Sequence, residues 1–158
     1  MKAIYIFTGP VKTGKTTRLF NWIKTKHDAA GILSVMVDDK KHLYSIEQLK
    51  SKCLETSSDN AILIGKYAFD PNVFSWAREQ LLKGLKTNPE VLIVDEIGFL
   101  ELKGEGMEPA FSSVLNSLKK MKETTILLVV RESLLEEVIG FYNLNKVIII
   151  KDLNEFED

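Results

Sequence analysis

Short, almost continuously apolar runs recur along the chain, and segments of helical spacing separate most of them. Such runs are typical of strands buried on both faces of a sheet. They lie at Ala3–Phe7, Ile32–Val37, Val91–Val94, Thr125–Val130 and Val147–Ile150. A polar turn at Asp38–Lys41 and weaker strand-like pieces at His42–Ile46 and Ala61–Phe69 complete the pattern. The apolar runs therefore predict a sheet whose strands are mostly interior.

The first two predicted helices follow from apolar spacing and from their end signals. One begins near Lys15 and is predicted to end near Ala30-Gly31, because glycine often terminates a helix. The other begins at Asp70-Pro71, an N-cap followed by proline at the first helical position, and ends before Asn88. Each helix would connect two strands of the same sheet.

Later in the chain, two more helices complete the alternation of strands and helices. Apolar residues from Phe111 to Met121 fall on one helical face. Ser133–Glu136 has the spacing of a capping box, which predicts a short helix beginning there. Strands alternating with helices of this length predict an α/β fold, a mostly parallel sheet with helices on both faces.

The composition is that of an ordinary globular domain and excludes several classes of protein. Of 158 residues, 45% are apolar and 27% are charged, so we expect one domain over residues 1–158, without disorder or coiled coil. Lys and Arg number 21 against 22 Asp and Glu, which gives no overall basic field and no clear nucleic-acid surface. No apolar stretch approaches the roughly 18 residues that span a membrane. We therefore expect no membrane partner. The single Cys53 allows no internal disulfide, which is typical of a reducing compartment, so a cytoplasmic protein is expected.

The loop after the first strand carries the most specific motif of the chain. Gly9-Pro10-Val11-Lys12-Thr13-Gly14-Lys15-Thr16 fits G-x-x-x-x-G-K-[ST] at every fixed position. Glycines let consecutive backbone N–H groups point at phosphate oxygens, and the following helix adds the positive end of its dipole. We expect Lys15 to reach the β- and γ-phosphates of a nucleotide and the Thr16 hydroxyl to ligate Mg²⁺. Lys12 either adds a phosphate contact or is solvated at the loop tip.

A second motif lies at the end of the strand Val91–Val94, where Asp95 and Glu96 follow directly. Asp95 is placed to hold Mg²⁺ through water, and Glu96 to polarise the attacking water as a general base. An adjacent acidic pair favours the P-loop class that carries its own catalytic glutamate and has an extra strand between the two motif strands. Thr125–Val130 is the candidate for that extra strand.

Arg131 ends the strand Thr125–Val130, so we expect its guanidinium at the same sheet edge as Lys15 and Asp95. It could sense the γ-phosphate or stabilise charge in the transition state. Alternatively, it is a solvated strand-end arginine paired with Glu132 or Glu136.

Three segments together resemble the cancer-related nucleoside-triphosphatase family, and the resemblance spans most of the chain. They are Gly9–Thr17, Ile64-Gly65-Lys66-Tyr67 followed by Phe74, and Val94-Asp95-Glu96-Ile97-Gly98-Phe99-Leu100-Glu101-Leu102. The resemblance implies a RecA-like sheet and slow hydrolysis of ATP, GTP and other nucleoside triphosphates. It extends the nucleotide-binding set through Thr17, so the expected contacts are Gly9, Pro10, Val11, Lys12, Thr13, Gly14, Lys15, Thr16 and Thr17.

The chain also departs from that family. The family usually has an arginine- and glycine-rich hairpin after its second strand, whereas Gly31–Gln48 contains no arginine. Leu100 stands where methionine is common. Gly9-Pro10 also resembles the loop of zinc-bearing thymidine kinases, but one cysteine cannot supply their structural zinc clusters.

The leading hypothesis is an Mg²⁺-dependent nucleoside-triphosphatase with catalytic residues Lys15, Glu96 and Arg131 and metal-binding residues Thr16 and Asp95. Its substrate would be ATP, GTP or another nucleoside triphosphate. One alternative is a P-loop kinase acting on a nucleoside or another small molecule. Another is a nucleotide-dependent switch with slow turnover, in which the glycine-bearing loop at Gly104–Gly106 moves.

Overall fold

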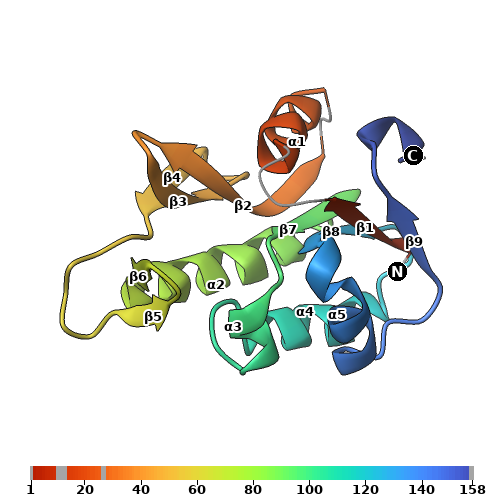
Figure 1. The fold of residues 1–158 in the computed structure, drawn as a ribbon. Coiled ribbons are helices and arrows are strands. Elements are labelled where there is room, and N and C mark those ends of the chain that lie inside the picture. Colours follow the sequence, from red (N-terminus) through yellow and green to blue (C-terminus); the bar gives the residue numbers. More distant parts are fainter. Residues whose placement is uncertain (1, 10–13, 26–27, 157–158) are drawn as a thin grey trace.

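The computed structural model describes residues 2–9, 14–25 and 28–156, which fold around a seven-stranded sheet of order β4-β3-β2-β7-β8-β1-β9 (Figure 1). Its strands are β1 (Ala3–Gly9), β2 (Ala29–Val37), β3 (Lys40–Ser45), β4 (Lys50–Cys53), β7 (Val91–Asp95), β8 (Thr125–Arg131) and β9 (Val147–Ile150). Strands β2, β7, β8, β1 and β9 pair in parallel, whereas β3 and β4 add an antiparallel edge. A separate hairpin joins β5 (Ile62–Ile64) to β6 (Tyr67–Phe69).

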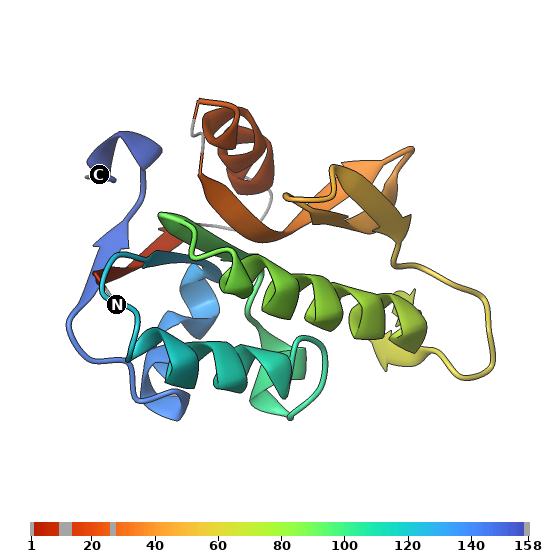
Figure 2. The same ribbon diagram turned by 180° about the vertical axis from the view of Figure 1, so that it is seen from behind.

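Helices cover both faces of the sheet, as Figures 1 and 2 show from opposite sides. On one face lies α1 (Lys15–Ile23), and on the other lie α2 (Pro71–Lys86), α4 (Ala110–Leu118) and α5 (Leu135–Phe141). Short helical turns are α3 (Phe99–Leu102), η1 (Glu132–Leu134) and η2 (Leu153–Glu155). The predicted α/β fold with a mostly parallel sheet is therefore confirmed.

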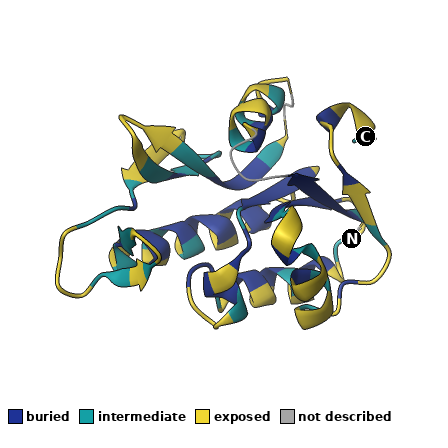
Figure 3. Cartoon of the chain, viewed as in Figure 1, coloured by how far each residue is buried: buried dark blue, intermediate teal, exposed yellow. Residues whose placement is uncertain are grey.

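Strand β8 shows why the central strands read as continuous apolar runs. Leu127 and Val129 belong to the core beneath α1, whereas Ile126, Leu128 and Val130 belong to the core beneath α2, α4 and α5. Because alternate side chains point to opposite faces, a strand covered on both sides needs an apolar residue at every position. Figure 3 shows the resulting buried band along the middle of the sheet.

Helix α2 begins as the sequence indicates. The Asp70 side chain accepts a hydrogen bond from the backbone N–H of Asn72 at 2.8 Å, and Pro71 occupies the first helical position. The helix ends at Lys86, before Asn88. None of the helices in the described ranges is long and apolar enough to cross a membrane.

The predicted end of the first helix was wrong. Helix α1 ends at Ile23, and Ala29–Gly31 form the first part of β2. Gly31 has φ of +123°, and a Cβ built on it would lie 2.0 Å from the carbonyl oxygen of Ile93 in β7. Glycine is therefore required here by close contact between two strands, a constraint that local sequence does not reveal.

Two smaller differences concern element starts. Ser133 does not cap α5, because it lies inside η1 and the helix begins at Leu135 without a side-chain cap. Lys40 and Lys41, expected in a turn, already belong to β3, and the turn narrows to Asp38-Asp39, both with positive φ. The segment Ala61–Phe69 forms the β5–β6 hairpin.

Candidate functional site

The predicted site residues that the structure describes lie where three neighbouring strands end. Strand β8 lies between β1 and β7, which confirms Thr125–Val130 as the strand inserted between the two motif strands. Gly9 is in register with Arg131, and Asp95 is in register with Val129. Carboxyl ends of adjacent parallel strands form the usual ligand-binding edge of an α/β sheet.

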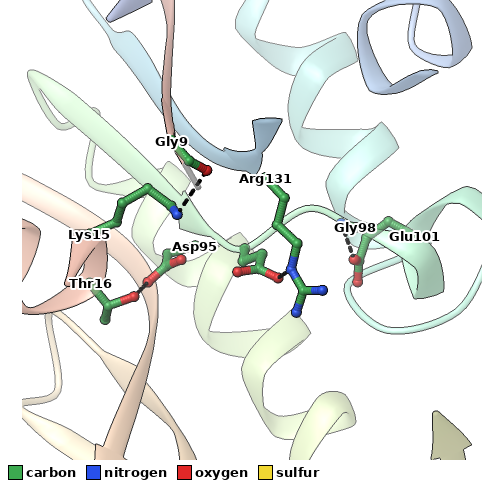
Figure 4. A network of polar contacts seen from close by, with 8 residues as sticks. Gly9, Lys15, Thr16, Asp95, Gly98, Glu101 and Arg131 are labelled. Carbon is green, nitrogen blue, oxygen red and sulfur yellow. Dashed lines mark hydrogen bonds and ion pairs between the residues drawn. The ribbon is translucent and has the colours of Figure 1, made fainter. Parts of the chain in front are cut away.

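Gly14 and Lys15 lie where the motif Gly9–Thr16, here called the phosphate loop after its predicted ligand, leads into α1. Gly14 has φ of +75°, a left-handed conformation that favours glycine, and Lys15 begins the helix. The Lys15 side chain is only 8% exposed, and its Nζ donates to the carbonyl oxygen of Gly9 at 3.2 Å (Figure 4). The expected contacts Pro10, Val11, Lys12 and Thr13 lie outside the described residues.

Thr16 and Asp95 meet although 79 positions separate them in the sequence. The Thr16 hydroxyl donates to Oδ2 of Asp95 at 2.9 Å, and the backbone N–H of Ser34 donates to the same oxygen at 3.2 Å. Asp95 is 2% exposed, and its Oδ1 has no hydrogen-bond partner among the described residues. Burial, and next the nearby Glu96 carboxylate, raise the pKa of Asp95 to about 7.

This pair suits a divalent cation. A buried carboxylate oxygen without a partner, beside a hydroxyl, offers the hard oxygen ligands that Mg²⁺ prefers. The described part of the chain contains no group of three or more His, Cys, Asp or Glu residues that could hold a metal. A Mg²⁺ ion here would take its remaining ligands from phosphate oxygens and water, as is common for this ion.

Glu96 and Arg131 form an ion pair beside the Thr16–Asp95 pair. Nε of Arg131 lies 3.0 Å from Oε1 of Glu96, with the two side chains 30% and 31% exposed. The suggested pairing of Arg131 with Glu132 or Glu136 was therefore wrong. Glu132 turns instead to Lys151 at 3.7 Å. Because β7 and β8 are neighbours, Glu96 and Arg131 leave the sheet at the same edge.

Two contributors were not predicted as site residues. Ser34, from β2, binds Asp95 through its backbone N–H; its sequence signal is one small polar residue in an apolar strand. Glu101 is 4% exposed and its carboxylate accepts from the N–H groups of Gly98 and Met107, both at 2.9 Å. Burial raises the pKa of Glu101 to about 7.

Glu101 has a structural role in the segment Val94–Leu102 and restrains the loop that follows it. Its carboxylate joins the start of α3 at Gly98 to Met107, and Nη1 of Arg78 donates to the Gly106 carbonyl at 2.6 Å. The loop considered as a moving element, Gly104–Gly106, is thus fastened to two neighbouring elements.

Two cavities meet at this edge of the sheet. The larger, about 680 Å³, runs along Gly14–Thr17 and past Phe20 toward β2 and β3. The smaller, about 410 Å³, extends from Asp95 and Glu96 toward the β5–β6 hairpin and α3. Both are lined by Ser34, Lys41, Tyr67, Glu96 and Arg131.

The strand order, with β8 between β1 and β7, and the sequence motif Gly9–Thr16 define this chain as a P-loop protein of the α/β class. A family model described as NTPase matches residues 4–151, so the chain belongs to this nucleoside-triphosphatase family. The resemblance of its motifs to the cancer-related nucleoside-triphosphatases is thereby confirmed.

Two solved structures share the fold. THEP1 from the hyperthermophile Aquifex aeolicus superposes with a TM-score of 0.72 at 20% sequence identity, covering 96% of this chain and 89% of that one. The solution structure of a human cancer-related nucleoside triphosphatase gives a TM-score of 0.65 at 19% identity, covering 98% and 90%. No curated protein matches the sequence.

Proposed function

We propose that this member of the family hydrolyses ATP, GTP and other nucleoside triphosphates to the diphosphate and phosphate, and that the reaction requires Mg²⁺. One observation carries the proposal: segments far apart in the sequence bring an ammonium, a hydroxyl–carboxylate pair and a carboxylate–guanidinium pair to one edge of the sheet. These are the groups that phosphoryl transfer to water needs, because its catalysis rests on positioning and on charge stabilisation.

The phosphate loop and Lys15 bind the triphosphate in this proposal. The backbone N–H groups of Gly14, Lys15, Thr16 and Thr17 donate to the phosphates, and the Lys15 ammonium leaves the Gly9 carbonyl for the β- and γ-phosphate oxygens. The exchange is favourable because a charged acceptor replaces a neutral one.

Thr16 and Asp95 are the residues that would hold Mg²⁺, Thr16 directly and Asp95 through water. The bound ion would neutralise the charge that develops on the leaving oxygen. Oδ1 of the buried Asp95 has no hydrogen-bond partner in the described part of the chain, which supports this assignment, since the ion or its water would supply the missing interaction.

Glu96 acts as the general base, and Arg131 positions it. The carboxylate accepts a proton as the water oxygen attacks the γ-phosphorus. Arg131 holds Oε1 of Glu96 through Nε, and its Nη groups can balance negative charge on the γ-phosphoryl oxygens.

Phosphate release from ATP, GTP, CTP and UTP, with and without Mg²⁺, tests the proposal. We expect Mg²⁺-dependent release from several nucleotides, and a loss of at least about 100-fold in Lys15→Ala and Glu96→Gln. Lys119→Ala and Glu123→Gln change the same residue types at exposed positions and serve as matched controls. Wild-type hydrolysis without Mg²⁺, or full activity of Glu96→Gln, would contradict the assignment.

A further inference from the structure

The smaller cavity is larger than hydrolysis requires. Its volume of about 410 Å³ lies within the range of small-molecule binding sites, roughly 300–1,000 Å³, whereas a water molecule occupies only about 30 Å³. It extends from Glu96 and Arg131 to the β5–β6 hairpin and α3. A second reactant beside the γ-phosphate would fit there.

The walls of this cavity are apolar and well packed. Leu43, Leu54, Phe69, Phe74 and Met107 line it, and each is at most 5% exposed. These residues come from the antiparallel edge of the sheet, the β5–β6 hairpin, α2 and the loop after α3. Because buried residues form its walls, the cavity is built into the fold.

The lining of this cavity also contains aromatic rings and two lysines. Tyr67 and Phe69 stack at 5.5 Å with an interplanar angle of 18°, and the ring of Phe99 is 47% exposed. Nζ of Lys41 lies 4.7 Å, and Nζ of Lys66 5.3 Å, from the centroid of the Tyr67 ring. Because Phe69 and the two ammonium groups already lie against Tyr67, the exposed ring of Phe99 is the surface on which a planar ring can stack. The ammonium groups can donate to polar ring edges.

We propose that this cavity binds a nucleoside that accepts the phosphoryl group in place of water. The inference rests on the proposed function, because it uses the same Lys15, Thr16–Asp95 and Glu96 site. A nucleoside combines a planar base for the aromatic walls with a sugar hydroxyl that can approach Glu96. The polar end of the cavity thus receives the reacting group and the apolar end the base.

The transfer step is balanced without another reactant. The sugar hydroxyl oxygen forms a bond to the γ-phosphorus, while the bond from that phosphorus to the β,γ-bridging oxygen breaks. The hydroxyl proton passes to the Glu96 carboxylate, which later releases it to solvent. The products are the nucleoside diphosphate and a nucleoside monophosphate.

The test incubates the protein with γ-³²P-labelled ATP, Mg²⁺ and, separately, adenosine, guanosine, cytidine, uridine and thymidine. Labelled nucleoside monophosphate and labelled phosphate are measured in the same samples. Phe99→Ala removes an aromatic wall of the small cavity, and Phe141→Ala, at a ring 58% exposed and lining neither cavity, is its matched control. Both sites are exposed enough for the variants to fold, and thermal melting checks this.

We expect at least one nucleoside to be phosphorylated. The ratio of monophosphate to phosphate should fall about threefold to tenfold in Phe99→Ala, the value of one stacking contact, and stay unchanged in Phe141→Ala. Normal phosphate release without any monophosphate would overturn the acceptor site and leave the proposed hydrolysis intact. An unchanged ratio in Phe99→Ala would also overturn it. If the protein neither hydrolyses nor transfers, the proposed function fails, and nucleoside binding followed by ligand-observed NMR then decides whether the cavity is a site.

Discussion

The buried carboxyl of Glu101 should make the stability of this fold depend on pH. Burial raises its pKa from 4.5 to about 7, against the opposing effect of N–H groups from Met107 and Gly98. Below pH 4.5 the folded and unfolded states both carry the protonated acid. Between pH 4.5 and 7 the unfolded chain releases its proton while the folded protein keeps it, so stability falls as pH rises. Above pH 7 Glu101 is ionised in both states, and the stability that its protonated form contributed is fully lost.

The substitution Glu101→Gln removes this titration while keeping the shape of the side chain. A pKa difference of about 2.5 units corresponds to about 3 kcal/mol, which is the most the group can contribute to the change. The free energy of unfolding of Glu101→Gln, relative to wild type, should therefore rise by up to about 3 kcal/mol between pH 4.5 and pH 8.

Urea unfolding of the nucleotide-free proteins at several pH values measures this difference. Glu105→Gln alters an exposed carboxylate in the same loop and should follow wild type across the range. A constant difference between Glu101→Gln and wild type would refute the reasoning. So would a difference that falls with pH, because it would show that the two backbone N–H groups outweigh burial and hold Glu101 ionised.

Three further predictions concern the fold and the site. Gly31→Ala should lower the free energy of unfolding by more than about 3 kcal/mol or prevent folding, because the added Cβ would overlap the Ile93 carbonyl. Circular dichroism measures this loss. Asp95→Asn should lower Mg²⁺-dependent phosphate release at least about 100-fold. The same substitution should raise the free energy of unfolding of the nucleotide-free protein, measured with urea at pH 8, because a neutral amide is easier to bury than a carboxylate. Leu81→Ala, at a fully buried position, should cost about 2–5 kcal/mol in urea unfolding, whereas Leu49→Ala, 75% exposed, should cost little.

The parts of the fold that sequence predicts are those with a local cause. Apolar runs such as Thr125–Val130 predict interior strands, because a strand covered on both faces needs apolar residues throughout. The Asp70-Pro71 pair predicts the start of α2, because capping depends on residues a few positions apart. The two motifs predict which residues share an edge, and the roles of Lys15 and Glu96 remain predictions.

The features that sequence does not predict depend on contacts between distant segments. In the sequence, Gly31 looks like the end of a helix. In the structure, the reason for glycine at this position is the close approach of β7, which sequence alone does not reveal. Arg131 has acidic neighbours in the sequence, but β-sheet pairing brings Glu96 to it from 35 positions away. Glu101 lies five residues after Glu96 in the sequence, yet its carboxylate accepts hydrogen bonds from the backbone N–H groups of Gly98 and Met107. In each case the decisive partner is set by topology, which local patterns leave undetermined.

The strand order also has a consequence for biosynthesis. Strand β1 is made first and leads into the phosphate loop, but its neighbours in the sheet are β8, beginning at Thr125, and β9, beginning at Val147. In a nascent chain on the ribosome, β1 therefore stays unpaired with its native neighbours β8 and β9 while β2 and β7 can already pair. Pairing across so long a separation is slow, because the entropy of closing the loop opposes it. Nucleotide binding should thus be among the last properties that a newly made molecule acquires.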